Sequence, residues 1–260
     1  MKENFCLTSK NVIQAAIEAS NKKMKDFEVD SNVLIIFSRG LLNYLKDVAN
    51  LENSDWLTPF HPYGGGELHR GKYNKTPISV LLPSMGASPM ASLTEDLIYC
   101  GAKIILLVCG SWGIGQNVKL LDYIIPTHGL GPDGTSIHYG RGLNEEIEMN
   151  KEIVDVLIKE TKKRAKNYHI GKNFSKEAFY QITNKEIFEL QKKGCISMEN
   201  GELNVLATIC NQKKINFGAI FYSYYNPLEG WNISWRDDRY KDCVNLEGDI
   251  ALAVIERLKK

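Results

Sequence analysis

The stretch Lys103-Ile-Ile-Leu-Leu-Val-Cys109 is an apolar run that leads directly into the glycine-bearing segment Gly110-Ser-Trp-Gly113. Such a run, bounded by glycine, predicts a β-strand followed by a tight turn. Glycines in this place allow backbone N–H groups to approach a ligand, because open α/β sheets bind ligands at the carboxyl ends of their strands. A purely structural turn also needs glycine, so the segment alone leaves both interpretations open.

Further apolar runs alternate with segments of helical periodicity along the chain, which predicts an α/β fold with a mixed central sheet. We expect strands at residues 33–37, 78–82, 103–109, 122–126, 194–198 and 216–222. We expect helices near residues 9–25, 90–101, 144–167, 185–193, 201–213 and 246–259. Two aperiodic segments, 54–73 and 228–245, are expected to be loops at a site or an interface. No repeat or linker divides the chain, so one domain is expected over residues 1–260.

The composition excludes several classes of function. The chain has 260 residues, 43% of them hydrophobic and 24% charged, which is ordinary for a soluble globular protein. Its 32 Lys and Arg residues balance 31 Asp and Glu residues, so no basic field indicates nucleic acid or an anionic membrane as a partner. The polar N-terminus lacks a signal peptide and no apolar run reaches the ~20 residues needed to cross a bilayer, so a cytoplasmic protein is expected. Six cysteines without a CxxC pair and five scattered histidines indicate buried thiols, no metal and no cofactor.

The segment Ser197-Met198-Glu199 ends another apolar run, just before a predicted helix. An ionised glutamate accepts hydrogen bonds through two oxygens, which suits the vicinal hydroxyl groups of a ribose. Met198 offers an apolar surface to the sugar ring. Glu199 could equally be a first-turn acid that complements the helix N-terminus.

The order of several motifs resembles the nucleoside phosphorylase family, which includes purine nucleoside and uridine phosphorylases. Residues 71–80 resemble a Gly-x-Tyr-x-Gly-x-x-Ile-Ser-Val hairpin, which leads into Ser84-Met85-Gly86. Residues 95–103 resemble a glutamate-rich helix with a Gly-Ala-Lys turn, and residues 119–126 resemble a Val-x-x-Gly-Asp-x-Val-Ile-Pro strand. Asp133-Gly134-Thr135-Ser136-Ile137-His138-Tyr139 is similar to the Glu-Gly-Thr-Ser-x-His-Tyr signature of the uridine phosphorylase branch. Residues 177–180 and 197–199 resemble Asp-x-Phe-Tyr and Glu-Met-Glu elements.

This resemblance implies a single-domain fold with a mixed, twisted sheet, partly closed into a barrel and flanked by helices. It implies cleavage of the N-glycosidic bond of a nucleoside by phosphate, a co-substrate, to give ribose 1-phosphate and a free base. It also implies a homo-oligomer, a dimer or a trimer of dimers, in which neighbouring subunits complete each other's sites. Met198 and Glu199 then bind ribose, and Ser111 with Gly110 binds phosphate.

The phosphate end of the site departs from the family pattern. The family's phosphate-binding arginines align with Leu42, with Leu107 or Val108, and with Gly64 or Gly65. Loss of these permanently charged, bidentate donors removes the groups best suited to a phosphate dianion. The family's early Gly-Asp-Pro-x-x-Arg turn corresponds to residues 38–42. Arg39 in this turn and Arg70 are candidates for replacement, although each could be an ordinary surface arginine.

The base end departs as well. The family's Val-Ser-Asp segment, whose aspartate protonates a purine, aligns with Tyr222-Ser223-Tyr224, which places Ser223 and Tyr224 at the catalytic position. A phenol with a pKa near ~10 is a weaker acid than a carboxyl group. The pyrimidine-reading positions hold Thr183 and Lys185. The expected base-binding residues are Trp112, Gly113, Phe179 and Tyr180, whose aromatic rings either hold a flat ligand or fill its pocket.

Three functions remain open at this point. The first is a nucleoside phosphorylase, specific for uridine or a purine nucleoside, with a rebuilt phosphate site. The second is a phosphate-independent nucleosidase, for which Glu202 is a candidate base. The third is a catalytically impaired homologue that binds a nucleoside.

Overall fold

Ten strands form one mixed sheet within residues 5–56 and 66–258, the part of the chain that this computed structural model describes. Strand β5 (Ile104–Gly113) is central, because it pairs with three neighbours: β1 (Asn32–Ile36), β9 (Cys195–Glu199) and β10 (Asn216–Tyr225). It runs parallel to β1 and β10 and antiparallel to β9. Residues 105–109 of β5 are buried, which explains its unbroken apolar sequence.

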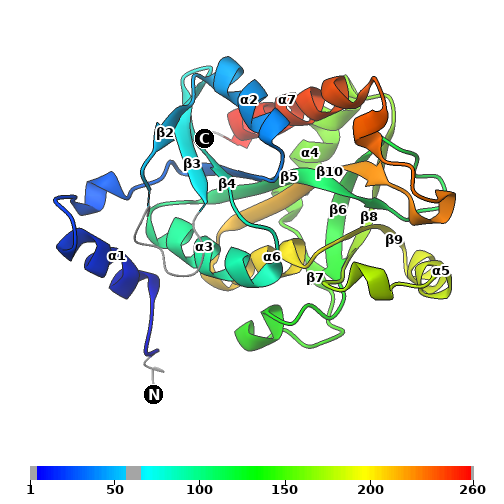
Figure 1. Ribbon diagram of the computed structural model, residues 1–260, viewed down its shortest axis with the longest axis horizontal. Coiled ribbons are helices and arrows are strands. Elements are labelled where there is room, and N and C mark those ends of the chain that lie inside the picture. The colour runs from blue at the N-terminus through cyan, green and yellow to red at the C-terminus, as the bar shows by residue number, and fades with distance from the viewer. Residues whose placement is uncertain (1–4, 57–65, 259–260) are drawn as a thin grey trace.

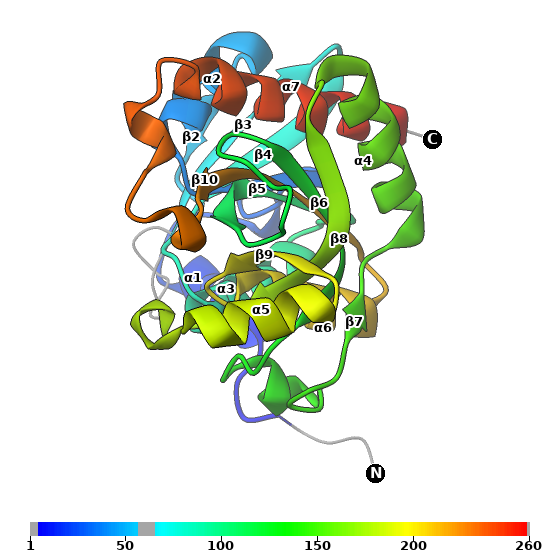
Figure 2. The same ribbon diagram turned by 90° about the vertical axis from the view of Figure 1, so that its right-hand side faces the viewer.

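Five strands close into a barrel. Beyond β5, β9 and β10, these are β6 (Tyr123–Leu130) and β8 (Tyr168–Ser175), and the ring of pairings runs β5–β10–β6–β8–β9–β5. Figure 2 shows β6, β8 and β9 curving around β5. The short strand β7 (Ile147–Glu148) pairs with β6 outside this ring.

The remaining strands extend the sheet on the other side of β5. Strand β4 (Thr76–Leu82) lies parallel to β1, and β3 (Glu67–Tyr73) and β2 (Glu52–Ser54) continue in antiparallel fashion. The expected hairpin at residues 71–80 therefore lies where β3 turns into β4. The sheet is closed at one end and open at the other.

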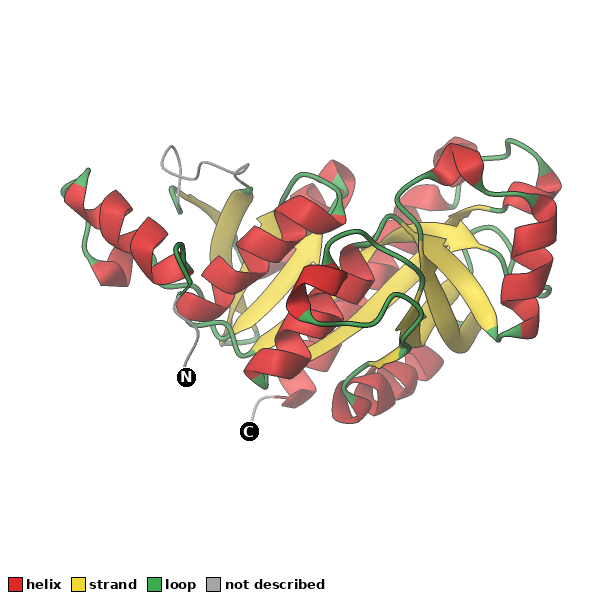
Figure 3. Cartoon of the chain, turned by 90° about the horizontal axis from the view of Figure 1, so that it is seen from below, coloured by secondary structure: helices red, strands yellow, loops and turns green. Residues whose placement is uncertain are grey.

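Helices cover both faces of this sheet (Figures 1 and 3). Helices α2 (Arg39–Ala49), α4 (Lys151–Arg164) and α7 (Tyr240–Leu258) pack together on one side. Helices α3 (Ala87–Tyr99) and α6 (Glu202–Lys213) pack together on the other, and α1 (Ser9–Glu18) projects from α3. Helix α5 (Asn184–Lys192) lies against β9. Short 3₁₀ turns occupy Met24–Asp26, Ser136–Tyr139, Phe179–Gln181, Pro227–Glu229 and Ser234–Arg236.

This arrangement confirms the predicted fold class and corrects several element boundaries. The expected turn at Gly110–Gly113 is wrong, because β5 continues through it. Helix α7 begins at Tyr240, inside the expected loop 228–245, and α1 ends at Glu18 rather than near residue 25. Helix α4 begins at Lys151, because residues 147–148 pair with β6 instead. Of the expected loop 54–73, residues 67–73 form β3, and residues 57–65 lie outside the described part. Within the described residues, no helix is long and apolar enough to span a membrane.

Candidate active site

Met198 and Glu199 are the last two residues of β9, which is one of the barrel strands. Met198 is fully buried and is the sheet partner of Trp112, while Glu199 is the partner of Ser175. Glu199 is only 5% exposed. Its Oε1 accepts hydrogen bonds from Asn173 (3.1 Å) and from the Ser175 hydroxyl, and its Oε2 accepts one from the backbone N–H of Leu203 (3.2 Å).

A second buried carboxyl group lies beside Glu199. Glu202 is 4% exposed, and its Oε1 accepts a 2.6 Å hydrogen bond from the backbone N–H of Gly86. Burial, followed by the negative charge of Glu202 and a hydrogen bond with it, raises the pKa of Glu199 well above its usual range. This environment favours the protonated form of Glu199. Glu202 is the first residue of α6, so its bond with the Gly86 N–H joins the start of α6 to the backbone just before α3.

Two buried hydroxyl groups lie on neighbouring strands near this pair. Ser111 of β5 and Ser223 of β10 are sheet partners and are at most 1% exposed. Neither hydroxyl oxygen has a hydrogen-bond partner among the described residues. Unpaired buried hydroxyl groups are costly and are often satisfied by a bound ligand or water. Gly113 is required beside them, because a Cβ there would lie 2.3 Å from the Ser223 oxygen.

Gly110 serves packing rather than a free backbone approach. It lies in the paired region of β5 opposite Tyr222, so its backbone belongs to the sheet. A Cβ at this position would lie 2.9 Å from the rings of both Tyr222 and Tyr224. The prediction that a turn at Gly110 exposes N–H groups to phosphate is therefore corrected: the glycine makes room for two aromatic rings.

Aromatic rings gather around Trp112 at the ends of β5 and β10. Trp112 is 9% exposed and stacks on Phe179, with 4.6 Å between ring centroids, and its Nε1 donates a 2.7 Å hydrogen bond to the Tyr224 hydroxyl. Burial raises the pKa of Tyr224 to about 12, although the bond from Trp112 opposes the shift. Tyr180, by contrast, is fully exposed and does not join the cluster, because the 3₁₀ turn Phe179–Gln181 directs neighbouring side chains differently.

Three further aromatic residues extend this cluster to the surface, and no motif predicted them. Tyr225 packs edge-on against Trp112 at 5.0 Å and contacts Trp231 at 4.9 Å, while Trp235 stacks on Tyr224 at 5.9 Å. Trp231 is 66% and Trp235 52% exposed. The signal that could have found Trp231 and Trp235 is the aromatic-rich segment 228–245, which was expected to be functional only as a whole.

The two candidate arginines are held by other carboxylates. Arg39, the first residue of α2, binds Glu67 of β3 and leaves 61% of its side chain exposed. Arg70 binds Asp30 through two hydrogen bonds of 3.1 and 3.2 Å.

Arg70 lies too far from Ser111 to hold the same anion. It is the sheet partner of Ser79, which lies level with Ile105 across β1. From Ile105 to Ser111 is six residues of strand, or about 20 Å at ~3.3 Å per residue. The structure therefore corrects the placement of Arg70 at the phosphate site. The aligned positions Leu42, Leu107 and Val108 are fully buried core residues, and Gly64 and Gly65 lie outside the described residues.

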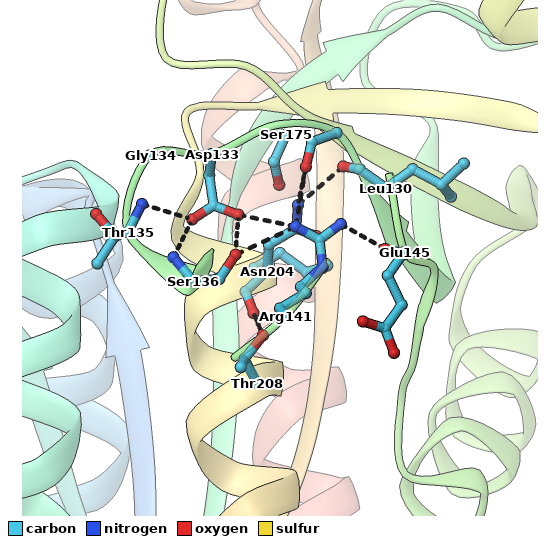
Figure 4. A network of polar contacts seen from close by, with 12 residues as sticks. Leu130, Asp133, Gly134, Thr135, Ser136, Arg141, Glu145, Ser175, Asn204 and Thr208 are labelled. Carbon is cyan, nitrogen blue, oxygen red and sulfur yellow. Dashed lines mark hydrogen bonds and ion pairs between the residues drawn. The ribbon is translucent and has the colours of Figure 1, made fainter. Parts of the chain in front are cut away.

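The Asp133–Tyr139 signature forms a network of buried hydrogen bonds beside α6 (Figure 4). Asp133 is fully buried and accepts hydrogen bonds from the backbone of Thr135 and Ser136 and from the Ser136 hydroxyl. Arg141, which sequence reasoning missed, reaches it at 3.1 Å and also binds the carbonyl oxygens of Gly131 and Glu145. This network holds the segment that follows β6.

A third buried acid lies in α7. Glu247 is fully buried, and neither of its carboxyl oxygens has a hydrogen-bond partner among the described residues. Burial raises the pKa of Glu247 well above its usual range. Thr183, at a base-reading position of the family, instead caps α5 by accepting a hydrogen bond from the Glu186 N–H.

These features define a class of α/β protein with a closed barrel and a buried Met-Glu step at its rim. A family model described as the Phosphorylase superfamily matches residues 34–256, and the chain belongs to this family. Uridine phosphorylase from Thermococcus kodakarensis is 30% identical over 112 residues, which cover 43% of this chain and 40% of that protein. Purine nucleoside phosphorylase DeoD-type 1 from Shewanella oneidensis is 28% identical over 167 residues, covering 63% and 65%. The matches thus span less than two thirds of either relative.

Solved structures share the fold over most of the chain. Uridine phosphorylase from Vibrio fischeri superposes with a TM-score of 0.76 at 19% identity, covering 89% of this chain and 93% of that one. Purine nucleoside phosphorylase from Toxoplasma gondii gives a TM-score of 0.74 at 17% identity, covering 90% and 93%. At such identities the likeness establishes the fold alone.

Proposed function

We propose that this protein cleaves the N-glycosidic bond of a nucleoside and transfers the ribosyl group to phosphate. The bond between C1′ and the base nitrogen breaks, its electron pair moves to the base, and a C1′–O bond forms to phosphate. The observation that carries this proposal is the buried Glu199, held at the barrel rim beside Trp112 and Met198.

Glu199 binds the ribose by exchanging one internal partner. Asn173, Ser175 and the Leu203 N–H already donate to three of its acceptor positions, and the carboxyl group is also hydrogen-bonded to Glu202. A ribose hydroxyl therefore replaces Glu202, while the three other donors hold the carboxylate in position. The negative charge of the carboxyl pair then stabilises the positive charge that develops on the sugar.

Ser111 and Tyr224 act on opposite sides of this sugar. The unpaired Ser111 hydroxyl donates to the incoming phosphate, and Tyr224 donates to the departing base. Ser223, level with Ser111, supports the same end of the site. Trp112, Gly113 and Phe179 form the base side, where the Trp112 indole narrows the space for a base.

A panel of uridine, inosine and adenosine, incubated with and without phosphate, tests the proposal. The expected result is free base and ribose 1-phosphate only when phosphate is present. Quenching of tryptophan fluorescence supplies a separate binding assay, because Trp112, Trp231 and Trp235 lie at the same end of the barrel. Absence of base release from every nucleoside in both conditions would overturn the proposal.

Water is a second candidate acceptor, favoured by the position of Glu202. When ribose takes its place on Glu199, the Glu202 carboxylate loses that partner and can accept a proton from water. Equal rates of base release with and without phosphate, and free ribose as the product, support this alternative.

The family resemblance also supports a homo-oligomer, which light scattering of the purified chain tests.

A further inference from the structure

The aromatic cluster at the ends of β5 and β10 presents ring faces to solvent. Trp231 packs against Tyr225 and Trp235 stacks on Tyr224, yet the two indoles are 66% and 52% exposed. Among the described residues, the one contact between a cation and a ring joins Lys22 to Phe27, neither of which belongs to this cluster. The faces of aromatic rings carry negative electrostatic potential, which attracts cations. The exposed indoles are therefore suited to a positively charged ligand.

Acidic side chains act on the strands that carry these rings. Burial, followed by the negative charges of three acids, raises the pKa of the Cys109 thiol in β5 well above its usual range. The three acids are Glu247, Glu202 and Glu199. Burial also raises the pKa of Tyr224 in β10 to about 12, and the charge of Glu202 adds to this shift. The field of these carboxyl groups favours a cation beside the rings.

The basic side chains near the cluster have acidic partners or face solvent. Lys176, which follows β8, donates to both carboxyl oxygens of Glu186 at 2.7 and 2.8 Å. Arg239 binds Asp237 through two side-chain hydrogen bonds of 2.9 and 2.6 Å. Arg236 is exposed, so water and salt screen its charge. These groups therefore contribute little positive charge to the base end of the site.

The acid at the base end decides which leaving group the site can release. A neutral base takes the electron pair of the broken C1′–N bond and leaves as an anion unless an acid protonates it. Tyr224, with its pKa of about 12, is a weak acid for this step. A base with a fixed positive charge leaves as a neutral molecule, because the same electron pair cancels its charge. Release of such a base requires no proton.

We propose that the nucleoside cleaved by this protein carries a fixed positive charge on its base, as a pyridinium riboside does. This inference rests on the proposed function, because it names the substrate class of the same site. The ring of Tyr224 and the indoles of Trp231 and Trp235 hold the cationic base by cation–π contacts. As the C1′–N bond breaks, the positive charge passes from the base to the sugar, which Glu199 binds. The products are the neutral base and ribose 1-phosphate.

Calorimetric titration with a matched pair of ribosides tests the charge preference. The riboside of nicotinamide is a pyridinium cation, and ribofuranosyl benzamide is its neutral carbon isostere, with an equivalent ring, amide and sugar. Without phosphate, we expect the dissociation constant of the cation to be roughly tenfold lower, which corresponds to a partly desolvated cation–π contact. Equal affinities, or tighter binding of the neutral isostere, would overturn the inference.

The double variant Trp231→Leu with Trp235→Leu removes the ring faces and keeps apolar side chains. We expect the preference for the cation to fall to about twofold or less, with little change in affinity for the neutral isostere. Phe188→Leu is the matched control, because Phe188 is 49% exposed on α5 and lies outside the cluster. It should keep the full preference, and thermal melts check that each variant is folded. A preference that survives in the double variant contradicts the role of these rings.

Adding the cationic riboside to the nucleoside panel separates this inference from the proposed function. We expect Tyr224→Phe to leave the release of nicotinamide unchanged, whereas the release of uracil from uridine slows. Equal slowing with both substrates contradicts the inference and leaves the proposed function intact. Absence of base release from every riboside overturns the proposed function, while the affinities of the matched pair still decide the charge preference.

Discussion

The indole of Trp112 donates a 2.7 Å hydrogen bond to the phenol oxygen of Tyr224. Tyr224 accepts this bond, so its own proton remains available to a base that leaves the sugar. Burial raises the pKa of Tyr224 to about 12, which keeps it protonated at neutral pH but makes it a weak acid. Trp112 thus belongs to the aromatic wall, and Tyr224 carries the hydroxyl group that we propose assists the leaving base.

Replacing Tyr224 with Phe tests this role. The ring and its stacking on Trp235 remain, whereas the donor hydroxyl is lost. We expect kcat for base release to fall about tenfold to a hundredfold, at the lower end of general-acid effects, with a smaller change in KM. Tyr99→Phe, on α3, is the control and should leave kcat unaltered. An unchanged kcat in Tyr224→Phe would show that the base leaves without help from this hydroxyl.

Replacing Glu199 with Gln tests the ribose contact. The amide oxygen can still accept from Ser175 and Asn173, so we expect the fold to persist while kcat/KM falls about a hundredfold, or ~2.7 kcal/mol of transition-state stabilisation. Steady-state kinetics with a thermal melt separate the two effects. The matched control is Glu186→Gln. Glu186 lies on α5, and this substitution removes its ion pair with Lys176. Equal losses in both variants would assign the effect to stability.

Replacing Glu247 with Met tests the cost of an unpaired buried acid. The raised pKa means that, above pH ~4.5, the unfolded chain releases this proton before the folded chain does, so Glu247 lowers stability as pH rises through that window. We expect the variant to gain about 1–3 kcal/mol in free energy of unfolding at pH 8 and less at pH 5. Urea denaturation at both pH values measures this difference.

Glu256→Met, an exposed position on the same helix, is the control for the added methionine. It should change the free energy of unfolding little at either pH. If Glu247→Met is instead destabilised at both pH values, the carboxyl group has a partner, such as a bound water, that stabilises it.

Replacing Arg141 with Met breaks the buried pair with Asp133 and leaves a carboxylate without its charge partner. We expect a loss of about 3–5 kcal/mol in free energy of unfolding. Adding Asp133→Asn should recover part of this loss, because the orphaned charge is removed. The double-mutant cycle is read from chemical denaturation. Strictly additive losses would indicate that the two side chains do not stabilise each other.

Apolar runs predicted strands both in the barrel and in its extension, such as β1, β5 and β10. These strands are buried and therefore need unbroken hydrophobic sequence. Strand β8 was not predicted, since its sequence includes polar residues that pair within the barrel, such as Asn173. Helix α2 was also missed, although Leu41, Leu42, Leu45 and Ala49 form its buried stripe, because Ser38–Leu42 was aligned with a family turn. In the structure Ser38 caps the helix by accepting a hydrogen bond from the Leu41 N–H.

The sequence by itself determined the fold class, the family and the Met198-Glu199 motif, because these depend on local pattern and on the order of motifs. The tertiary structure alone decided how charges are partnered. Glu202 binds the Gly86 N–H, Arg39 binds Glu67 and Arg70 binds Asp30 because strands and helices distant in sequence bring them together. The same holds for the wall around Trp112, whose members come from four segments of the chain. Electrostatic and stacking energies fall off within a few ångströms, so only the folded positions determine them.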